Sequence, residues 1–149
     1  MLSLEESLKI LKETKALIEG HFILSSGLHS PKYVQCAQLM SKPSKAAQIC
    51  QSLAKKIKIE HSNIDLILSP AMGGIVVGYE IGKLLGVETI FSERVNGKFQ
   101  LRRGFKIKQD TNVLIVEDVI TTGKSSIECS NLVKAVSYTH LRAHETEAY

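Results

Sequence analysis

The stretch VLIVEDVITTGKS, residues 113–125, decides the fold and the candidate chemistry of this chain. Its apolar run is typical of a buried strand and ends in two adjacent carboxylates, Glu117 and Asp118. The apolar pair Val119 and Ile120 then separates the acids from a loop of small hydroxyl and glycine residues. A strand that leads through such a loop into a helix predicts a ligand site at the carboxyl end of the strand.

The Gly-Lys-Ser end of this stretch does not complete an NTPase P-loop. That motif, G-x-x-x-x-G-K-[ST], requires a glycine five positions before Gly123. The chain has Asp118 there, and a carboxylate would repel a triphosphate. A G-x-G-x-x-G fingerprint is also missing from the sequence. Both common nucleotide-binding motifs are therefore excluded.

The loop still has the composition of a phosphate-binding loop. Backbone N–H groups at a helix start are unpaired and carry positive partial charge, and Gly123 permits close approach. The hydroxyl donors are Thr121, Thr122, Ser125 and Ser126. A monophosphate suits this loop, while ribose hydroxyls or a Mg²⁺ ion suit the carboxylates. We expect a sugar phosphate as ligand. In the alternative interpretation, the acids merely end a strand and the loop merely caps a helix.

Outward from this stretch, strand and helix patterns alternate. Apolar runs predict strands at 64–70, 87–91 and 112–119, with short β pieces at 22–24 and 33–35. Helical spacing predicts helices at 4–18, 44–58, 73–86 and 125–136, with Gly20 as a stop and Ser44 as an N-cap. This order predicts an α/β fold with a parallel sheet flanked by helices. The segments SPAMGG (69–74), SERVNGK (92–98) and EDVITTGKS (117–125) fall at strand ends, where ligands bind.

Composition narrows the class of protein but not its activity. The chain has 149 residues, which suits one domain, and a net charge of +4, which mildly favours polyanions. The three cysteines, Cys36, Cys50 and Cys129, form no C-x-x-C motif and indicate reduced thiols in a cytoplasmic protein. No apolar run reaches 18 residues and no signal-peptide pattern begins the chain, so we expect neither a membrane partner nor secretion.

The residues of the opening stretch resemble the phosphoribosyl-pyrophosphate (PRPP) motif of type I phosphoribosyltransferases. That motif has apolar residues, two acids, two more apolar residues and a Thr/Gly/Ser loop. Within the family, the chain is similar to the orotate-using group over roughly residues 1–136. The segments that carry this likeness, in the family's order, are GHFILSSGLHSPKYVQ (20–35), SPAMGGIVVGYEIGKLLG (69–86) and SERVNGKFQLRRGF (92–105).

The resemblance implies a fold, a reaction and partners. The fold would be a type I phosphoribosyltransferase sheet with an N-terminal hood over residues 1–43, a PRPP-binding core over 44–136, and C-terminal strands missing. In the reaction, orotate displaces pyrophosphate from C1 of PRPP to give orotidine 5′-monophosphate. Mg²⁺ is the implied cofactor, carried by PRPP near Asp118 without a direct protein ligand. A homodimer is the implied assembly, in which the loop 92–104 reaches the neighbouring subunit's site.

The resemblance also assigns roles to residues. It implies Arg94, Lys98 and Asp118 as the catalytic set. Glu117 and Asp118 would hold the ribose, residues 121–125 the 5′-phosphate, and Thr121 would also lie near orotate. The implied PRPP-binding set is Arg94, Lys98, Gln100, Glu117, Asp118, Val119, Ile120, Thr121, Thr122, Gly123, Lys124 and Ser125. In the alternative interpretation, residues 92–104 form only a solvated basic β-hairpin.

The chain departs from the family pattern at several positions. Some family members have lysine where this chain has Ser25, Gly73 and Val95, and many have histidine at Gln100. Lys124 fills a position that is often small. Two rival functions share the PRPP motif: a purine phosphoribosyltransferase, which would lack the hood segment, and a PRPP-sensing regulator that binds nucleic acid. Retention of Arg94 and Lys98, and the absence of a DNA-reading module in the sequence, argue against the regulator.

The last residues, SYTHLRAHETEAY (137–149), break the alternating pattern. A further strand is expected after the helix that ends near Val136, but this tail contains no apolar run of four. It also offers no match to the family's C-terminal arginine that pairs with the carboxylate of orotate. His140 and His144 have metal-ligand spacing on a helix but no third ligand. We therefore interpret the tail as foreign to the family and the chain as a truncated member.

This interpretation predicts that the chain as written releases little pyrophosphate in response to orotate. Without its charged partner, the orotate carboxylate would be poorly bound, and the sheet edge beside residues 113–117 would stay uncovered. Fusing a family-like C-terminal segment after Val136 should restore turnover in a pyrophosphate-release assay. Robust turnover by the 149-residue chain would contradict the truncation hypothesis.

Overall fold

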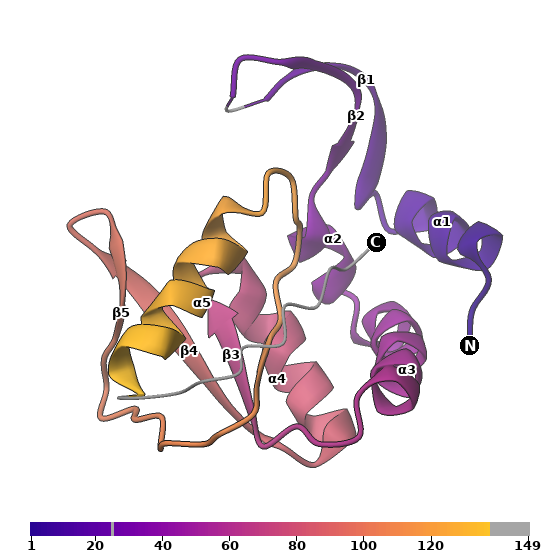
Figure 1. Ribbon diagram of the computed structural model, residues 1–149. Helices are drawn as coiled ribbons and strands as arrows, with labels where there is room; N and C mark the ends of the chain where they lie inside the picture. Colours follow the sequence, from indigo (N-terminus) through magenta and orange to yellow (C-terminus); the bar gives the residue numbers. More distant parts are fainter. Residues whose placement is uncertain (25, 138–149) are drawn as a thin grey trace.

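The computed structural model describes residues 1–24 and 26–137 (Figure 1). Helices cover both faces of a central sheet, and a separate two-stranded ribbon stands away from it. The elements, in chain order, are α1 (Leu4–Glu13), β1 (Leu17–Ile23), β2 (His29–Val34), α2 (Cys36–Met40), α3 (Pro43–Glu60), β3 (Leu66–Pro70), α4 (Gly73–Leu85), β4 (Glu88–Val95), β5 (Lys98–Leu101), β6 (Val113–Ile115) and α5 (Lys124–Val136).

The central sheet is built around strand β3. Its strand order is β5-β4-β3-β6. Strand β3 runs parallel to β4 and to β6, whereas β5 folds back antiparallel to β4. Parallel strands joined through helices are the predicted arrangement, so the α/β class is confirmed. Strand β5 comes from the charged segment after β4. The sequence alone allows this segment to be either a loop or a hairpin.

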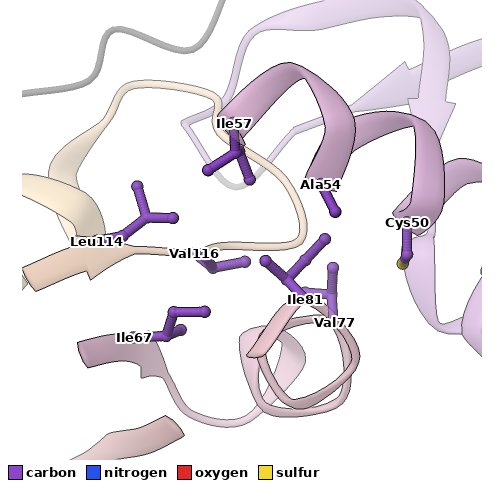
Figure 2. Close-up of a cluster of buried hydrophobic side chains, with 8 residues drawn as sticks. All are labelled: Cys50, Ala54, Ile57, Ile67, Val77, Ile81, Leu114 and Val116. Carbon is purple, nitrogen blue, oxygen red and sulfur yellow. The ribbon is translucent and has the colours of Figure 1, made fainter. Parts of the chain in front are cut away.

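Every residue of β3 is buried, and its two faces enter two different cores. Ile67 packs against α3 and α4 in a cluster with Cys50, Ala54, Ile57, Val77, Ile81, Leu114 and Val116 (Figure 2). Leu66 and Leu68 belong to a second cluster, with Ile90, Phe99, Ile107, Cys129 and Val133. Successive side chains of a strand point to opposite faces. This alternation explains why an unbroken apolar run suits a strand with helices on both sides.

A third cluster joins the first three helices to the ribbon. It contains Ile10, Ala16, Cys36, Leu39 and Ala46. Each of the three clusters holds one of the free, buried cysteines, namely Cys50, Cys129 and Cys36. Burial raises the pKa of each thiol, and that of Cys50 reaches about 11. All three thiols are therefore protonated at neutral pH.

Helix α4 packs very closely on the sheet, because glycines face the strands. A Cβ added at Gly78 would lie 1.9 Å from Ser69 Oγ, and one added at Gly82 would lie 1.8 Å from Thr89 Oγ1. Gly86, with φ of 70°, ends the helix in the left-handed conformation, as its position in the sequence predicts. The glycine spacing therefore sets how near α4 comes to β3 and β4.

The ribbon of β1 and β2 occupies the region predicted as the hood. Its antiparallel register pairs Leu17 with Val34 and Ile23 with His29, with a shift between Glu19 and Phe22. The β pieces expected at 22–24 and 33–35 are confirmed as parts of longer strands. Figure 1 shows the ribbon projecting beyond the helical layer that carries α1 and α2.

The helix predicted over 4–18 is too long, because α1 ends at Glu13. The Thr14 hydroxyl donates to the Ile10 carbonyl, and Lys15 has φ of 59°, which stops the helix. From Leu17 onward the backbone pairs with β2, so Gly20 is a strand residue. Ala16 is fully buried in the third cluster, which explains how an apolar pattern continued past the end of the helix.

Other predicted boundaries also move. Helix α3 begins at Pro43 with Lys42 at the N-cap position, so Ser44 is not its cap. Strand β4 extends to Val95 because β5 pairs with its second half. Strand β6 is shorter than predicted, although the Val116 N–H still donates to the Leu68 carbonyl over 3.0 Å.

Gly82→Ala should destabilise the fold by roughly 1–3 kcal/mol, because overpacking forces neighbouring atoms apart. The new methyl group would meet Thr89 Oγ1 at 1.8 Å and the Val87 carbonyl at 3.0 Å. Urea unfolding measures the change, and Lys83→Ala, on the neighbouring exposed position, serves as the control. Combining Gly82→Ala with Thr89→Ala should recover part of the loss. An unchanged unfolding midpoint for Gly82→Ala would contradict the close packing.

Candidate active site

The three predicted site segments meet at one edge of the sheet. Strands β3, β4 and β6 run parallel, so the residues that follow β3 and β6 emerge on the same side. The Ala71 N–H donates to the Ser92 carbonyl over 2.8 Å, which joins SPAMGG to SERVNGK. A Cβ on Gly74 would lie 3.1 Å from the Val116 carbonyl, so the start of α4 also borders the chain that leaves β6.

The two carboxylates leave β6 in different directions, and both are partly buried. Glu117 accepts a hydrogen bond of 2.6 Å from the Ser126 hydroxyl, in the first turn of α5. Asp118 lies over the start of α4, where a Cβ on Gly73 would fall 2.5–2.8 Å from its carboxyl group. In this arrangement, a side chain at position 73 would require the Asp118 carboxyl group to move. The acids therefore border the Thr loop on one side and SPAMGG on the other.

These carboxylates also influence two buried thiols. Burial is the main cause that raises the pKa of Cys36, and the negative charge of Asp118 adds to it. The pKa of Cys129 is also raised mainly by burial. The hydrogen bond with Ser92 lowers this pKa, and the negative charge of Glu117 raises it by a smaller amount. The thiols are thus kept neutral beside the acids rather than activated as nucleophiles.

The loop after the acids has one buried anchor and an exposed rim. Val119 packs against the third cluster, whereas Ile120, Thr121 and Thr122 are exposed. Gly123, with φ of 73°, occupies the N-cap position of α5. The Lys124 N–H points to Thr122 Oγ1 at 3.4 Å. The loop thus exposes two threonine hydroxyls beside a helix N-terminus, where an anion is favoured.

One predicted hydroxyl donor of this loop is already engaged. Ser126 donates to Glu117, so its hydrogen is not available to a phosphate in this arrangement. Its actual role is to orient Glu117 against α5. Ser125 stays partly buried beside the loop. The sequence offered no signal for the Glu117–Ser126 contact, because the two residues lie on different elements.

The charged segment 92–104 contains a basic β-hairpin, a shape that both interpretations of that sequence allow. Asn96 and Gly97, with φ of 51° and 79°, form the turn between β4 and β5. Lys98 and Gln100 are exposed on β5. On the neighbouring coil, Arg103 makes two hydrogen bonds of 2.8 and 2.9 Å to Glu93, and these lower the pKa of Glu93.

Arg94 has partners within its own chain. Its guanidinium contacts Glu128 of α5 at 2.5 Å and donates to the Gly97 carbonyl over 2.9 Å. It also lies 4.0 Å from the centre of the Phe99 ring. Lys124 Nζ is 4.0 Å from the other Glu128 oxygen. The structure therefore brings the hairpin and the Thr loop together through Glu128, a residue that the sequence did not single out.

Three residues named in the sequence analysis, Ser25, His140 and His144, lie outside the described residues. On the ribbon, His21 and His29 contact each other with 2.7 Å between ring nitrogens. Among residues 1–24 and 26–137, no three His, Cys, Asp or Glu side chains converge as a metal site. Over the same ranges, no helix has the length and apolar character needed to cross a bilayer.

Comparison with known proteins identifies curated relatives that are about half identical to this chain over the aligned residues. Orotate phosphoribosyltransferase of Helicobacter pylori (strain Shi470) is 49% identical over 123 residues, which cover 83% of this chain and 61% of that protein. Relatives with the same name from Carboxydothermus hydrogenoformans and Erythrobacter litoralis are both 48% identical, over 86% and 87% of this chain and 67% and 68% of their own lengths. The chain thus spans about three fifths of the Helicobacter relative.

Solved structures agree on the fold. Orotate phosphoribosyltransferase from Aeropyrum pernix has a TM-score of 0.72 at 23% identity, over 88% of this chain and 75% of its own. UMP synthase of Leishmania donovani has a TM-score of 0.74 at 21% identity, over 89% of this chain and 28% of its own. No protein-family model matches the sequence. On the identity and coverage of these curated relatives, this chain belongs to the orotate phosphoribosyltransferase family.

Proposed function

We propose that this chain carries the PRPP-binding core of an orotate phosphoribosyltransferase, EC 2.4.2.10, in UMP biosynthesis. It transfers the 5-phosphoribosyl group of PRPP to orotate, giving orotidine 5′-monophosphate and pyrophosphate. The observation that carries the proposal is the carboxylate pair after β6 beside an exposed threonine loop at the start of α5. The boundaries 1–43 for the hood and 44–136 for the core belong to the same proposal.

The two carboxylates supply the ribose site. Asp118 receives no hydrogen bond from any side chain of the described residues, so its oxygens are available to ribose hydroxyls. Glu117 is oriented by Ser126 and presents its carboxylate beside the Thr loop. The loop holds the 5′-phosphate through the hydroxyls of Thr121 and Thr122 and the N–H groups at the start of α5. Thr121, exposed on this rim, also borders orotate in the proposed complex.

The donor atoms at this edge suit a magnesium ion. Mg²⁺ prefers oxygen ligands and is commonly held by one or two carboxylates together with substrate phosphates. Asp118 offers such oxygens beside the backbone of Gly73. When bound with PRPP, the ion neutralises charge on the pyrophosphate. The remaining steps depend on the chain's own residues, which position the ribose and hold the two anionic ends of PRPP apart.

The reaction exchanges one bond at C1 of the ribose for another. The bond to the pyrophosphate oxygen breaks, and the bond to a ring nitrogen of orotate forms, while positive charge develops on the ribose. The carboxylates at 117 and 118 hold the ribose hydroxyls near this charge. Lys98 and Arg94 neutralise the negative charge that grows on pyrophosphate. Because little covalent chemistry falls to the protein, positioning and electrostatics supply most of the rate.

The cytoplasmic homodimer inferred from the sequence remains part of the proposal. An exposed apolar stripe on α4 and just before it supports a protein interface: Met72, Val76 and Tyr79 are 83%, 54% and 67% exposed. Their spacing places them on one side of the helix, and large exposed apolar groups that gather together mark contact surfaces. Three free, buried thiols suit a reducing compartment. In the dimer, the hairpin 92–104 would act across subunits.

The proposed base specificity is tested by titrating the chain with PRPP and Mg²⁺ against orotate, hypoxanthine or uracil. The names of the curated relatives favour orotate over the purine alternative. Binding or turnover with hypoxanthine but not orotate would replace this proposal with the purine one. In the chain extended after Val136 by a family-like C-terminal segment, PRPP binding without any base-dependent step would favour the PRPP-sensing regulator.

Asp118→Asn should weaken PRPP binding roughly ten- to hundred-fold, because one hydrogen bond to a charged group contributes about 1.5–3 kcal/mol. Its fold should survive, since Asn has nearly the same volume over Gly73. Isothermal titration calorimetry measures the affinity. Asp110→Asn is the matched control, because Asp110 is exposed and its φ of 59° also suits asparagine. Equal affinity in the Asp118 variant and the wild type would remove Asp118 from the site.

In the chain fused after Val136 to a family-like C-terminal segment, Lys98→Ala should lower kcat more than it raises KM, because the lysine charge meets pyrophosphate as that charge develops. Lys106→Ala, another exposed lysine beyond the hairpin, should leave both constants nearly unchanged. If the hairpin acts in trans, mixing Lys98→Ala with Asp118→Asn subunits should restore part of the activity through heterodimers. No recovery, with subunit exchange demonstrated by mass spectrometry, would count against a shared site.

A further inference from the structure

Arg94 contacts three groups of its own chain. One edge of its guanidinium contacts the Glu128 carboxylate at 2.5 Å, and another nitrogen donates to the Gly97 carbonyl. One face covers Phe99 at 4.0 Å. In this arrangement each terminal nitrogen of the guanidinium already donates one hydrogen, to a carboxylate and to a carbonyl. A phosphate group that binds both terminal nitrogens at once therefore competes with these partners.

Glu128 is placed to contact two cations from different parts of the site. It lies one turn after Lys124 on α5, and its second oxygen is 4.0 Å from the Lys124 ammonium. Helix α5 begins at Gly123, the end of the proposed phosphate loop. Glu128 thus connects the hairpin that carries Arg94 to the helix that would hold the 5′-phosphate. The Arg94–Glu128 pair spans 34 positions of sequence.

Folding stability does not explain this pair. Both side chains are partly exposed, at 38% for Arg94 and 32% for Glu128, and such surface ion pairs contribute little to stability. The charge arrangement is also unfavourable for the proposed ligand, because a carboxylate beside two cations repels a polyanion.

We propose that Glu128 is a positioning residue that holds Arg94 until pyrophosphate displaces it. This inference rests on the proposed function: in the proposed dimer, Arg94 leaves Glu128 of its own chain and reaches the pyrophosphate bound in the neighbouring subunit's site. When the pyrophosphate group binds, Arg94 exchanges the Glu128 oxygen for phosphate oxygens. When pyrophosphate leaves, Glu128 recaptures Arg94. Glu128 thereby weakens pyrophosphate binding, speeds its release, and links the position of the hairpin to helix α5.

The decisive variant is Glu128→Gln, which keeps the size of the side chain and removes its charge. Its dissociation constant for Mg²⁺-pyrophosphate, measured by calorimetry on the full chain, should fall about two- to five-fold, the range expected for losing one exposed charge contact. Glu128→Asp, which retains the charge, should stay within about two-fold of wild type. A merely structural role predicts weaker or unchanged binding in Glu128→Gln.

Glu93→Gln is the matched control. Glu93 lies on the same hairpin, next to Arg94, but its partners are Arg103 and Arg102. This variant changes the net charge of the chain by the same amount, so it measures the general effect of charge on anion binding. The inference requires Glu128→Gln to strengthen pyrophosphate binding clearly more than Glu93→Gln. Equal gains in both variants would overturn it.

A double-variant cycle tests whether Glu128 acts through Arg94. In an Arg94→Ala background, Glu128→Gln should give no further gain in affinity. A gain of equal size in that background would overturn the proposed exchange. Wild-type protein that binds PRPP but not pyrophosphate would overturn this inference and leave the proposed function in place. Wild-type protein that binds neither ligand would remove both.

Discussion

The site depends on one constraint, the parallel pairing of β3 with both β4 and β6. Strand β3 is buried along its whole length, and its neighbours run in the same direction on either side. Parallel strands bring their carboxyl ends to one edge, so segments that are distant in sequence leave the sheet together. Without that pairing, the acids after β6 and the glycines at the start of α4 would not lie together.

Close contacts between backbone and side-chain atoms also shape this edge of the sheet. Asp118 occupies space that a side chain on Gly73 would fill, and the tight seating of α4 on β3 and β4 depends on Gly78 and Gly82. The same geometry separates the two acids, since Glu117 is drawn toward α5 by Ser126 while Asp118 stays over α4. Adjacent residues thereby face different parts of one site. The positive charge comes from a separate hairpin whose arginine is balanced by Glu128.

Local sequence patterns predicted the main strands and helices. The end of α1 and the role of Glu128 depend on tertiary contacts, which those patterns do not show. The apolar runs located β3 and β6, and the spacing that ends at Gly86 located α4 correctly. The end of α1 was missed because Ala16 continues the helical spacing while its burial comes from packing beyond the helix. Glu128 was missed for a related reason. Its partner lies on another element, and a single acid in a helix carries no mark of that contact.

Each of the three cysteines lies in a different hydrophobic cluster, so the reactivity of each thiol reports on the motion of one part of the fold. Cys50 belongs to the layer of α3 and α4, Cys129 to the layer under α5, and Cys36 to the cluster beneath the ribbon. A buried, protonated thiol reacts only when its surroundings open, so its alkylation rate measures the opening of one layer. The native cysteines can thus separate fluctuations of the cluster beneath the ribbon from those of the two clusters beside the sheet, without any introduced label.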